Sequence, residues 1–303
     1  MKASLRQCAG AEDFPAISEF LFQLYEPDNR DHNWLQPIWE YAYTHPWFDE
    51  GSASRIGIWE DSSGIVAAAL YELRLGEAFF QIRPDYRGLK PEMFDYAEQQ
   101  LLGSNPEGQS YLKAYVSEGD EVLEQIAHQR GYRKQPESDR PMSQLRIPDP
   151  FPLPVLPAGF RLKSLADEND LVKMDRVLWR GFNHPGDPPP DGVSGRKKMQ
   201  SGPHYRKDLA IVVEAENGEF AAFSGLWFDP VNRICYVEPV ATDPDYRRLG
   251  LGTAAVMEGV RRCAALGAGV AYVGSGMPFY RAMGFEQVFT LNCWTKLFPD
   301  GRK

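Results

Sequence analysis

The strongest chemical signal in the 303-residue chain is the stretch DPDYRRLGLGTAAV at positions 243–256, where charged residues give way to glycines. Arg247 and Arg248 stand just before Gly250 and Gly252. Glycines at a strand-to-helix turn let the backbone approach a ligand closely. The N-terminus of a helix offers unpaired N–H groups at the positive end of its dipole. This combination suits a pyrophosphate, and the alternative is a tight turn with two solvated arginines.

The flanking sequence predicts the elements that would position this stretch. RICYVEPVA, which precedes it, alternates β-branched and aromatic residues from Ile234 to Val240 and predicts a strand. AAVMEGVRRCAAL, which follows, places apolar residues at helical spacing and predicts a helix with one buried face. The stretch is not a P-loop, because no Gly-Lys-Ser/Thr follows. It is also not the dinucleotide fingerprint, because position 255 is alanine and the arginines come first.

Two motifs in order resemble the GNAT N-acetyltransferase superfamily. R-x-x-G-x-G between a strand and a helix resembles its acetyl-CoA signature. MPFYRAMGFEQV, at 277–288, resembles its second motif, a helix carrying a tyrosine before a Gly-Phe that starts the last strand. The resemblance is strong over 160–296 and faint over the first half, and the layout is similar to tandem GNAT proteins. It implies an α/β (α+β) fold with two tandem GNAT-like domains, each a mixed, mostly antiparallel twisted sheet flanked by helices.

The resemblance also implies acetyl-CoA as co-substrate and no metal. Family members often have an asparagine seven residues before the motif tyrosine, but here that position is Val273. Contact with the pantetheine is therefore expected from Ser275 or from the backbone. The residues expected to bind the cofactor are Val240, Ala241, Thr242, Arg247, Arg248, Leu249, Gly250, Leu251, Gly252, Thr253 and Ser275.

A carboxylate on the predicted strand is the candidate general base. Acetyl transfer needs a neutral amine, whereas a free alkylamine has a pKa of about 10. Glu238 shares a strand face with Val240 and could take the proton directly or through water. The alternative is a surface strand carboxylate. Pro239 cannot donate to a sheet and indicates a bulge, which would free N–H groups near Val240 to bind the thioester oxygen.

Tyr280 occupies the position where the resemblance implies a phenol that protonates the departing thiolate. The alternative is a core tyrosine whose hydroxyl is satisfied. No cysteine or serine stands in an evident nucleophile context, so direct transfer without an acyl-enzyme is expected.

The chain repeats in outline on either side of a proline-rich stretch, IPDPFPLPVLPAGF at 147–160, which predicts an extended connector. Four parallels occur in the same order, at separations of 153 to 160 residues. The first pairs Arg6 with Arg161, the second Gly64 with Gly218, and the fourth Gly131 with Gly284. The third contains two pairs, Pro84 with Pro244 and Arg87 with Arg247. The predicted division is a degenerate GNAT-like domain at 1–147, a linker at 148–158 and a catalytic domain at 159–303.

The first copy has lost the candidate chemistry. Lys90, Pro91 and Glu92 stand where the second copy has glycine, leucine and glycine, and Ala127 stands in place of the tyrosine. Proline removes a backbone N–H and glutamate repels an anion. Residues 1–150 hold 14 basic and 25 acidic residues, a net −11, whereas the remainder holds 19 and 17, a net +2. The first domain is therefore predicted not to bind acetyl-CoA or to catalyse.

The first domain has two possible roles. It could serve as a scaffold for the second domain, or it could form a wall of the acceptor site. For the second role, the aromatic stretch at 31–50 would hold an amine by stacking and charge. In that case Trp34, Trp39 and Trp47 would lie on the surface, and the alternative is that they are core.

Composition excludes several classes of protein. A net charge of −9 and an acidic first half disfavour binding to nucleic acid. No apolar run approaches the ~18 residues of a membrane span, and the N-terminus has no apolar signal region, so a cytoplasmic protein is expected. The four cysteines show no C-x-x-C spacing, which disfavours a zinc site or a disulfide framework.

The acceptor is expected to be a small-molecule or peptide amine, and the protein a monomer or homodimer. A long Pro/Gly loop at 180–205 is expected to shape specificity. Its His184 and His204 could contact the acceptor or be solvated. Transfer of another acyl group from CoA, and a non-catalytic acyl-CoA-binding or partner-binding protein, remain as alternatives.

Overall fold

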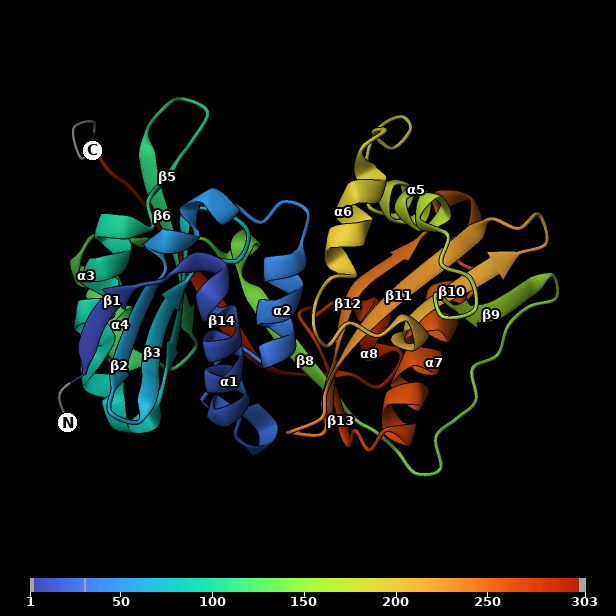
Figure 1. Ribbon diagram of the computed structural model, residues 1–303, viewed down its shortest axis with the longest axis horizontal. Helices are drawn as coiled ribbons and strands as arrows, with labels where there is room; N and C mark the ends of the chain where they lie inside the picture. The colour runs from blue at the N-terminus through green and yellow to red at the C-terminus, as the bar shows by residue number, and fades with distance from the viewer. Residues whose placement is uncertain (1–2, 30, 300–303) are drawn as a thin grey trace. The chain divides into compact units, whose positions relative to one another are not determined.

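The computed structural model describes residues 3–29 and 31–299 and divides into two compact units (Figure 1). The first unit comprises residues 1–43, 47–142 and 288–303, and the second comprises 44–46 and 143–287. Neither unit is contiguous, which differs from a division at 1–147 and 159–303. The final strand of each sequence half lies in the unit that the other half builds.

The second unit is a six-stranded sheet in the order β8-β13-β12-β11-β10-β9. Only β12 and β13 are parallel, and the other neighbours are antiparallel. This mixed, mostly antiparallel sheet confirms the predicted fold class. The elements of this unit are β8 Arg140–Arg146, β9 Phe160–Ser164, α5 Leu171–Gly181, α6 Gly192–Met199, β10 Ala210–Ala215, β11 Phe220–Asp229, β12 Ile234–Thr242, α7 Leu251–Ala265, β13 Val270–Val273 and α8 Pro278–Arg281.

Both faces of this sheet are covered. All six residues of β10 are buried, although successive side chains of a strand point to opposite faces. On one face α7 packs against β10, β11 and β12 (Figure 1), and Ile211, Val213 and Cys235 share a core with Ala255 and Val260. Helix α5 packs against β11 and β12 as well. This packing fixes the ends of β12 and α7, where the candidate site lies.

The first unit repeats the same sheet plan, in the order β1-β2-β3-β4-β6-β14. Strands β4 and β6 are parallel, and β5 and β7 are short strands beside β6 and β14. The elements are β1 Ser4–Gln7, α1 Phe14–Leu24, α2 Gln36–Thr44, β2 Gly57–Asp61, β3 Gly64–Leu70, β4 Glu77–Ile82, α3 Lys90–Gln100, β5 Gly103–Ser104, β6 Ser110–Ser117, α4 Glu121–Gln129, β7 Arg133–Lys134 and β14 Glu286–Leu297.

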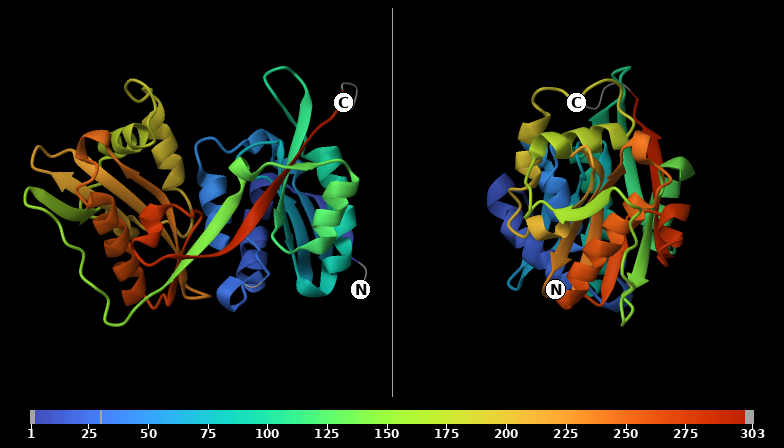
Figure 2. Two further views of the ribbon diagram at one scale, coloured as in Figure 1. Left: turned by 180° about the vertical axis from the view of Figure 1, so that it is seen from behind. Right: turned by 90° about the vertical axis from the view of Figure 1, so that its right-hand side faces the viewer.

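The exchanged strands are fully integrated in their sheets. In the first unit, β14 pairs with β6 from Leu291 to Leu297, and Figure 2 shows this red strand beside β6. Cys293 of β14 and Phe298, the residue after the strand, are buried in that unit's core. In the second unit, β8 pairs with β13 from Ser143 to Arg146. Residues 147–159, which connect β8 to β9, form no helix or strand.

Burial decides several open points. Trp34 and Trp39 are core residues of the first unit, so they cannot form a stacking surface, whereas Trp47 is 64% exposed. All four cysteines are buried and unpaired. None of the helices within 3–29 and 31–299 has the length and hydrophobicity that a membrane span needs.

Candidate active site

The candidate site lies where β12 and β13 part. Their parallel pairing joins Ile234–Tyr236 to Val270–Tyr272, and within the described residues β12 has no β13 partner beyond that point. On its other edge, the register between β12 and β11 shifts between Ser224 and Leu226. This shift adds one residue to β12 around Pro239 and confirms the predicted bulge.

Backbone donors of β12 face the gap that β13 leaves. The N–H of Asp243 donates to the carbonyl of Ala221 on the β11 side. Because N–H directions alternate along an antiparallel strand, the N–H groups of Val240 and Thr242 point away from β11. Ala241, also predicted as a cofactor contact, directs its N–H toward β11. Two of the three predicted β12 residues therefore offer donors to a ligand in the gap.

The backbone of Glu238 is fixed by two residues of β11. Trp227 donates its indole N–H to the Glu238 carbonyl at 2.9 Å. Gly225 lies so close that a Cβ there would stand 2.7 Å from the same oxygen. Glu238, Val240 and Thr242 are each partly exposed. Because the bulge between Val237 and Val240 interrupts the two-residue alternation of the strand, a face shared by Glu238 and Val240 stays a prediction. The sequence showed no signal for Trp227 in this role.

Tyr280 lies on α8 in an apolar setting and is 8% exposed. Its ring packs edge-to-face against Phe279 and Phe285. Burial, followed by the charge of Glu238, raises the pKa of Tyr280 well above its ordinary value of about 10. The phenol therefore keeps its proton at neutral pH.

The start of α7 is open to an anion. The N-cap is Gly250, which has no side chain to cap the helix, and no acidic residue stands in the first turn. The first helical backbone bond joins the Ala254 N–H to Gly250, so the N–H groups of Leu251, Gly252 and Thr253 have no intrahelical acceptor. Positions 247–250 are exposed. This end of the helix fits the diphosphate of coenzyme A.

The two glycines of the motif serve different purposes. Gly250 has a φ of +77° with open space around its Cβ position, so backbone conformation accounts for it. A Cβ on Gly252 would lie 2.8 Å from the Thr242 hydroxyl oxygen and 3.3 Å from the Phe279 ring. Gly252 therefore allows α7 to pack closely against the end of β12.

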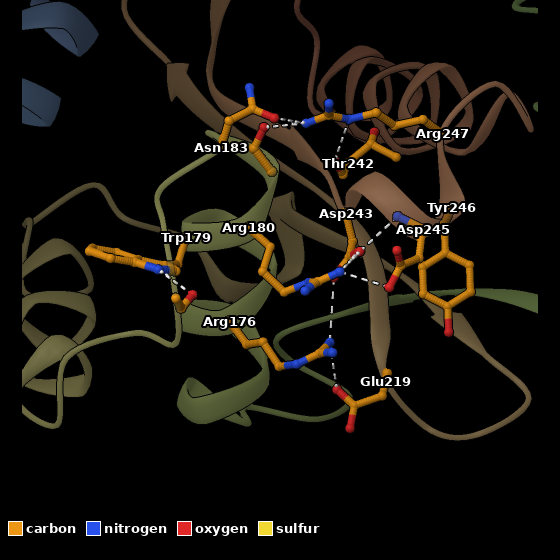
Figure 3. Close-up of polar contacts among 12 residues, drawn as sticks. Arg176, Trp179, Arg180, Asn183, Glu219, Thr242, Asp243, Asp245, Tyr246 and Arg247 are labelled. Atoms are coloured by element: carbon orange, nitrogen blue, oxygen red, sulfur yellow. Dashed lines mark hydrogen bonds and ion pairs between the residues drawn. The ribbon is translucent and has the colours of Figure 1, made fainter.

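The two arginines also differ (Figure 3). Arg247 donates to the Gly181 carbonyl at 2.9 Å, to the Asn183 side chain at 2.8 Å and to the Thr242 carbonyl at 3.3 Å. Its guanidinium thus ties the loop to the end of α5. Arg248 is exposed with a φ of +64°, and it forms no ion pair with any residue in the described part of the chain. Of this pair, Arg248 is the side chain available to a ligand.

A buried ion cluster beneath this loop was not predicted from the sequence. Asp243 has a fully buried side chain and accepts two bonds from Arg180, at 2.6 and 3.0 Å (Figure 3). Arg176 lies 3.5 Å away. Burial opposes ionisation of Asp243, but the bonds from Arg180 and from the Asp245 N–H outweigh it and lower the pKa below its usual value. The cluster fixes α5 to the end of β12.

The remaining predicted residues have local partners. Ser275 lies just beyond β13, and its hydroxyl accepts the Met277 N–H at 3.2 Å at the start of α8. Leu249 is an exposed residue of the loop. His184 stacks on Trp179 with ring centroids 4.4 Å apart. No group of His, Cys, Asp and Glu suited to a metal occurs within residues 3–29 and 31–299.

The equivalent place in the first unit has different chemistry. Strand β4 ends at Ile82, which aligns with Thr242, and both its N–H and its carbonyl bond to the side chain of Asn33, at 2.9 and 3.2 Å. The first turn of α3 contains Pro91 and Glu92, and Glu92 accepts the indole N–H of Trp59. The backbone donor equivalent to that of Thr242 is therefore occupied here, and the start of α3 has one N–H fewer.

Comparison with known proteins matches part of the chain to a protein family and nearly the whole chain to a known fold. Residues 172–285 match the family model described as the acetyltransferase (GNAT) family. No curated protein matches the sequence. The match covers α5 to α8 of the second unit, and with them every residue of the candidate site.

Two solved structures resemble nearly the whole chain. A GCN5-related N-acetyltransferase from Sphaerobacter thermophilus has a TM-score of 0.66 at 17% identity and covers 99% of this chain and 96% of its own. A tandem GNAT protein from the clavulanic acid biosynthesis pathway has a TM-score of 0.65 at 13% identity, with coverages of 99% and 100%. At these identities the likeness concerns the fold, and that fold is a tandem GNAT arrangement.

Proposed function

We propose that the protein transfers an acetyl group from acetyl-CoA to a primary amine, starting from the match of residues 172–285 to the acetyltransferase (GNAT) family model. The GNAT fold supports acyl transfer from coenzyme A. The observation that carries the finer proposal is the start of α7, which has no side-chain cap and no acidic residue in its first turn, beside the gap where β12 has no β13 partner.

Two sets of groups bind acetyl-CoA in this proposal. The N–H groups of Leu251 to Thr253 and the guanidinium of Arg248 hold the diphosphate. The N–H groups of Val240 and Thr242 donate hydrogen bonds to the part of acetyl-CoA that lies in the gap, and they stabilise negative charge on the acyl oxygen. When bound, acetyl-CoA supplies an acetyl group activated as a thioester.

Two side chains move protons. Glu238 accepts the proton of the acceptor amine, directly or through water. The Tyr280 hydroxyl, which stays protonated at neutral pH, donates its proton to the departing sulfur. All four cysteines are buried, which supports direct transfer without an acyl-enzyme.

The direct test is a panel of small amines, amino acids, aminoglycosides and peptides, assayed with acetyl-CoA and a free-thiol readout. We expect thiol release above background with at least one amine, together with an acetylated product by mass spectrometry. Butyryl-CoA and succinyl-CoA as donors distinguish acetyl transfer from transfer of another acyl group. Background hydrolysis with every amine would contradict the proposal.

Tyr280→Phe is the matched active-site variant, because it removes only the hydroxyl and keeps the ring packing. Loss of a general acid costs about 10²-fold or more in turnover, while the affinity for acetyl-CoA, measured by calorimetry, should stay within about twofold. The raised pKa also predicts that wild-type activity does not fall through ionisation of Tyr280 between pH 8 and 10. Wild-type turnover in the phenylalanine variant would remove Tyr280 from the mechanism.

A further inference from the structure

The first unit contains a cavity of about 380 Å³ at the point where β4 and β6 part. Their parallel pairing ends at Phe79 and Tyr115, and both residues line the cavity. The other walls come from residues 31–33, the start of α3 and residues 117–123. The volume lies within the usual range of small-molecule sites. The cavity occupies, in the first unit, the same topological position as the gap after β12 in the second.

The walls do not suit an anion. The Asn33 side chain occupies the backbone N–H and carbonyl of Ile82. Pro91 has no N–H to offer at the start of α3. The one lysine of the cavity wall, Lys90, is buried and pairs with Asp120 at 2.6 Å. The backbone groups of Ile82 and the Lys90 ammonium are therefore used within the protein, and position 91 has no donor.

The charge of the cavity wall is negative. Arg87 forms an ion pair with Asp31 at 2.5 Å, and Lys90 forms one with Asp120. Both cationic side chains of the wall are therefore already paired within the protein. Glu118 and Glu121 remain, both exposed at the mouth. Neither forms an ion pair with any other described residue. The mouth thus has two carboxylates without a cation. The charged residues of the wall are Asp31, Arg87, Lys90, Glu118, Asp120 and Glu121.

Aromatic side chains line the interior beside the Lys90–Asp120 pair. The rings of Phe79 and Tyr115 stack with centroids 4.3 Å apart, and the Arg140 guanidinium lies over the Tyr115 ring. The His32 ring stacks on Phe289 at 4.1 Å, and its Nδ1 contacts the Ser117 hydroxyl. Burial lowers the pKa of His32 despite the nearby charges of Glu118 and Asp31, so the ring is neutral at pH 7. An apolar wall beneath carboxylates suits a cation that has an apolar body.

We propose that this cavity binds a small organic cation, with its ammonium group at Glu118 and Glu121 and its apolar body against the rings of His32 and Tyr115. The site lies wholly within the first unit and does not depend on the activity proposed for the second. It gives the domain that lacks the acetyl-CoA motif a ligand of the opposite charge.

The test titrates the full chain with benzylammonium, and with benzyl alcohol as the neutral isostere, by isothermal calorimetry without acetyl-CoA. Benzylammonium should bind and benzyl alcohol should bind at least about fivefold more weakly. Glu118→Gln combined with Glu121→Gln should weaken benzylammonium roughly fivefold to tenfold, because two exposed charge contacts are lost. Glu107→Gln, an exposed carboxylate of the β5–β6 turn that does not line the cavity, is the control and should change nothing.

Leu291→Trp separates this cavity from any amine site in the second unit. Leu291 lines the cavity from β14 and is partly exposed, so an indole there fills space while both carboxylates remain. Benzylammonium binding should fall at least tenfold, with an unchanged melting temperature as the check on folding. Three results would overturn the proposal: no binding at millimolar benzylammonium, equal binding of the alcohol, or affinity insensitive to both the glutamine pair and the tryptophan.

Discussion

Arg247 and Arg248 are adjacent residues of one type whose surroundings give them separate roles. Arg247 makes three hydrogen bonds that join the loop to α5 and β12. Arg248 is exposed, has a positive φ and lies just before the first turn of α7. Successive turn residues of this kind aim backbone N–H groups at an anion, and a free guanidinium beside them adds charge. We therefore assign ligand binding to Arg248 and loop structure to Arg247.

This assignment predicts opposite effects of two alanine variants. Arg248→Ala should weaken acetyl-CoA binding about tenfold, since hydrogen bonds between charged groups contribute about 1.5–3 kcal/mol, and should leave the melting temperature unchanged. Arg247→Ala should lower the free energy of unfolding by about 1–3 kcal/mol, because three modest bonds are lost. Calorimetry and chemical denaturation measure the two quantities. A variant pair with the effects interchanged would show that the assignment is wrong.

At the residue scale the sequence indicated a strand-to-helix turn, but it could not assign separate roles to the residues within it. Glycines and arginines before a helix predicted an anion site, and α7 begins at Leu251 without a side-chain cap at Gly250. The clash that requires glycine at 252 comes from Thr242 and Phe279. Those contacts form only when β12, α7 and α8 pack together. A spacing pattern contains no such information, so Gly252 and Gly250 looked equivalent.

At the scale of elements, the end of β12 is the joint on which the site depends. Pro239 predicted the bulge because proline lacks a backbone donor. What holds the strand beyond the bulge is the Asp243 carboxylate, which binds Arg180 and Arg176 of α5. Arg176 and Arg180 lie one turn apart on the same face of α5. The sequence showed neither the burial of Asp243 nor its partners, since they lie more than sixty positions apart.

Asp243→Asn should lower the free energy of unfolding by about 1–3 kcal/mol at pH 7, because a buried carboxylate is lost and its arginines, which reach solvent, are partly compensated by water. The folded-state pKa of Asp243 is depressed, so its contribution is present above the unfolded pKa of about 4 and is lost as pH falls through the folded value. The difference between variant and wild type should therefore shrink below pH 4.

Asp245→Asn is the control for this experiment, because Asp245 pairs with the same Arg180 but is 71% exposed. Its loss should cost about 0–1 kcal/mol. Thermal unfolding followed across pH 3–8 compares the two variants. Equal destabilisation by both would mean that burial of Asp243 does not set its contribution.

At the scale of the whole molecule, the internal repeat predicted two units of one plan, and each unit has that plan. The repeat could not reveal that the units exchange their last strands. Strand β14 directly follows the Gly-Phe at 284–285, whereas β7 and a short 3-10 helix lie between the Gly-Tyr at 131–132 and β8. Which sheet each joins is decided by long-range pairing, which a local pattern does not encode.

The exchange predicts how the protein responds to a cut between its halves. The connector at 147–159 is exposed, with Leu153 at 77% and Val155 at 86%, so a protease site placed there should be cleaved in the folded protein. The C-terminal fragment then still supplies β14 to the first sheet, and the N-terminal fragment still supplies β8 to the second. We expect the fragments to co-elute in size-exclusion chromatography under native conditions and to separate only in denaturant. Contiguous domains at 1–147 and 159–303 would need no such exchange of strands. If the two fragments separated under native conditions and each kept a cooperative thermal transition, the exchange of β8 and β14 would be refuted.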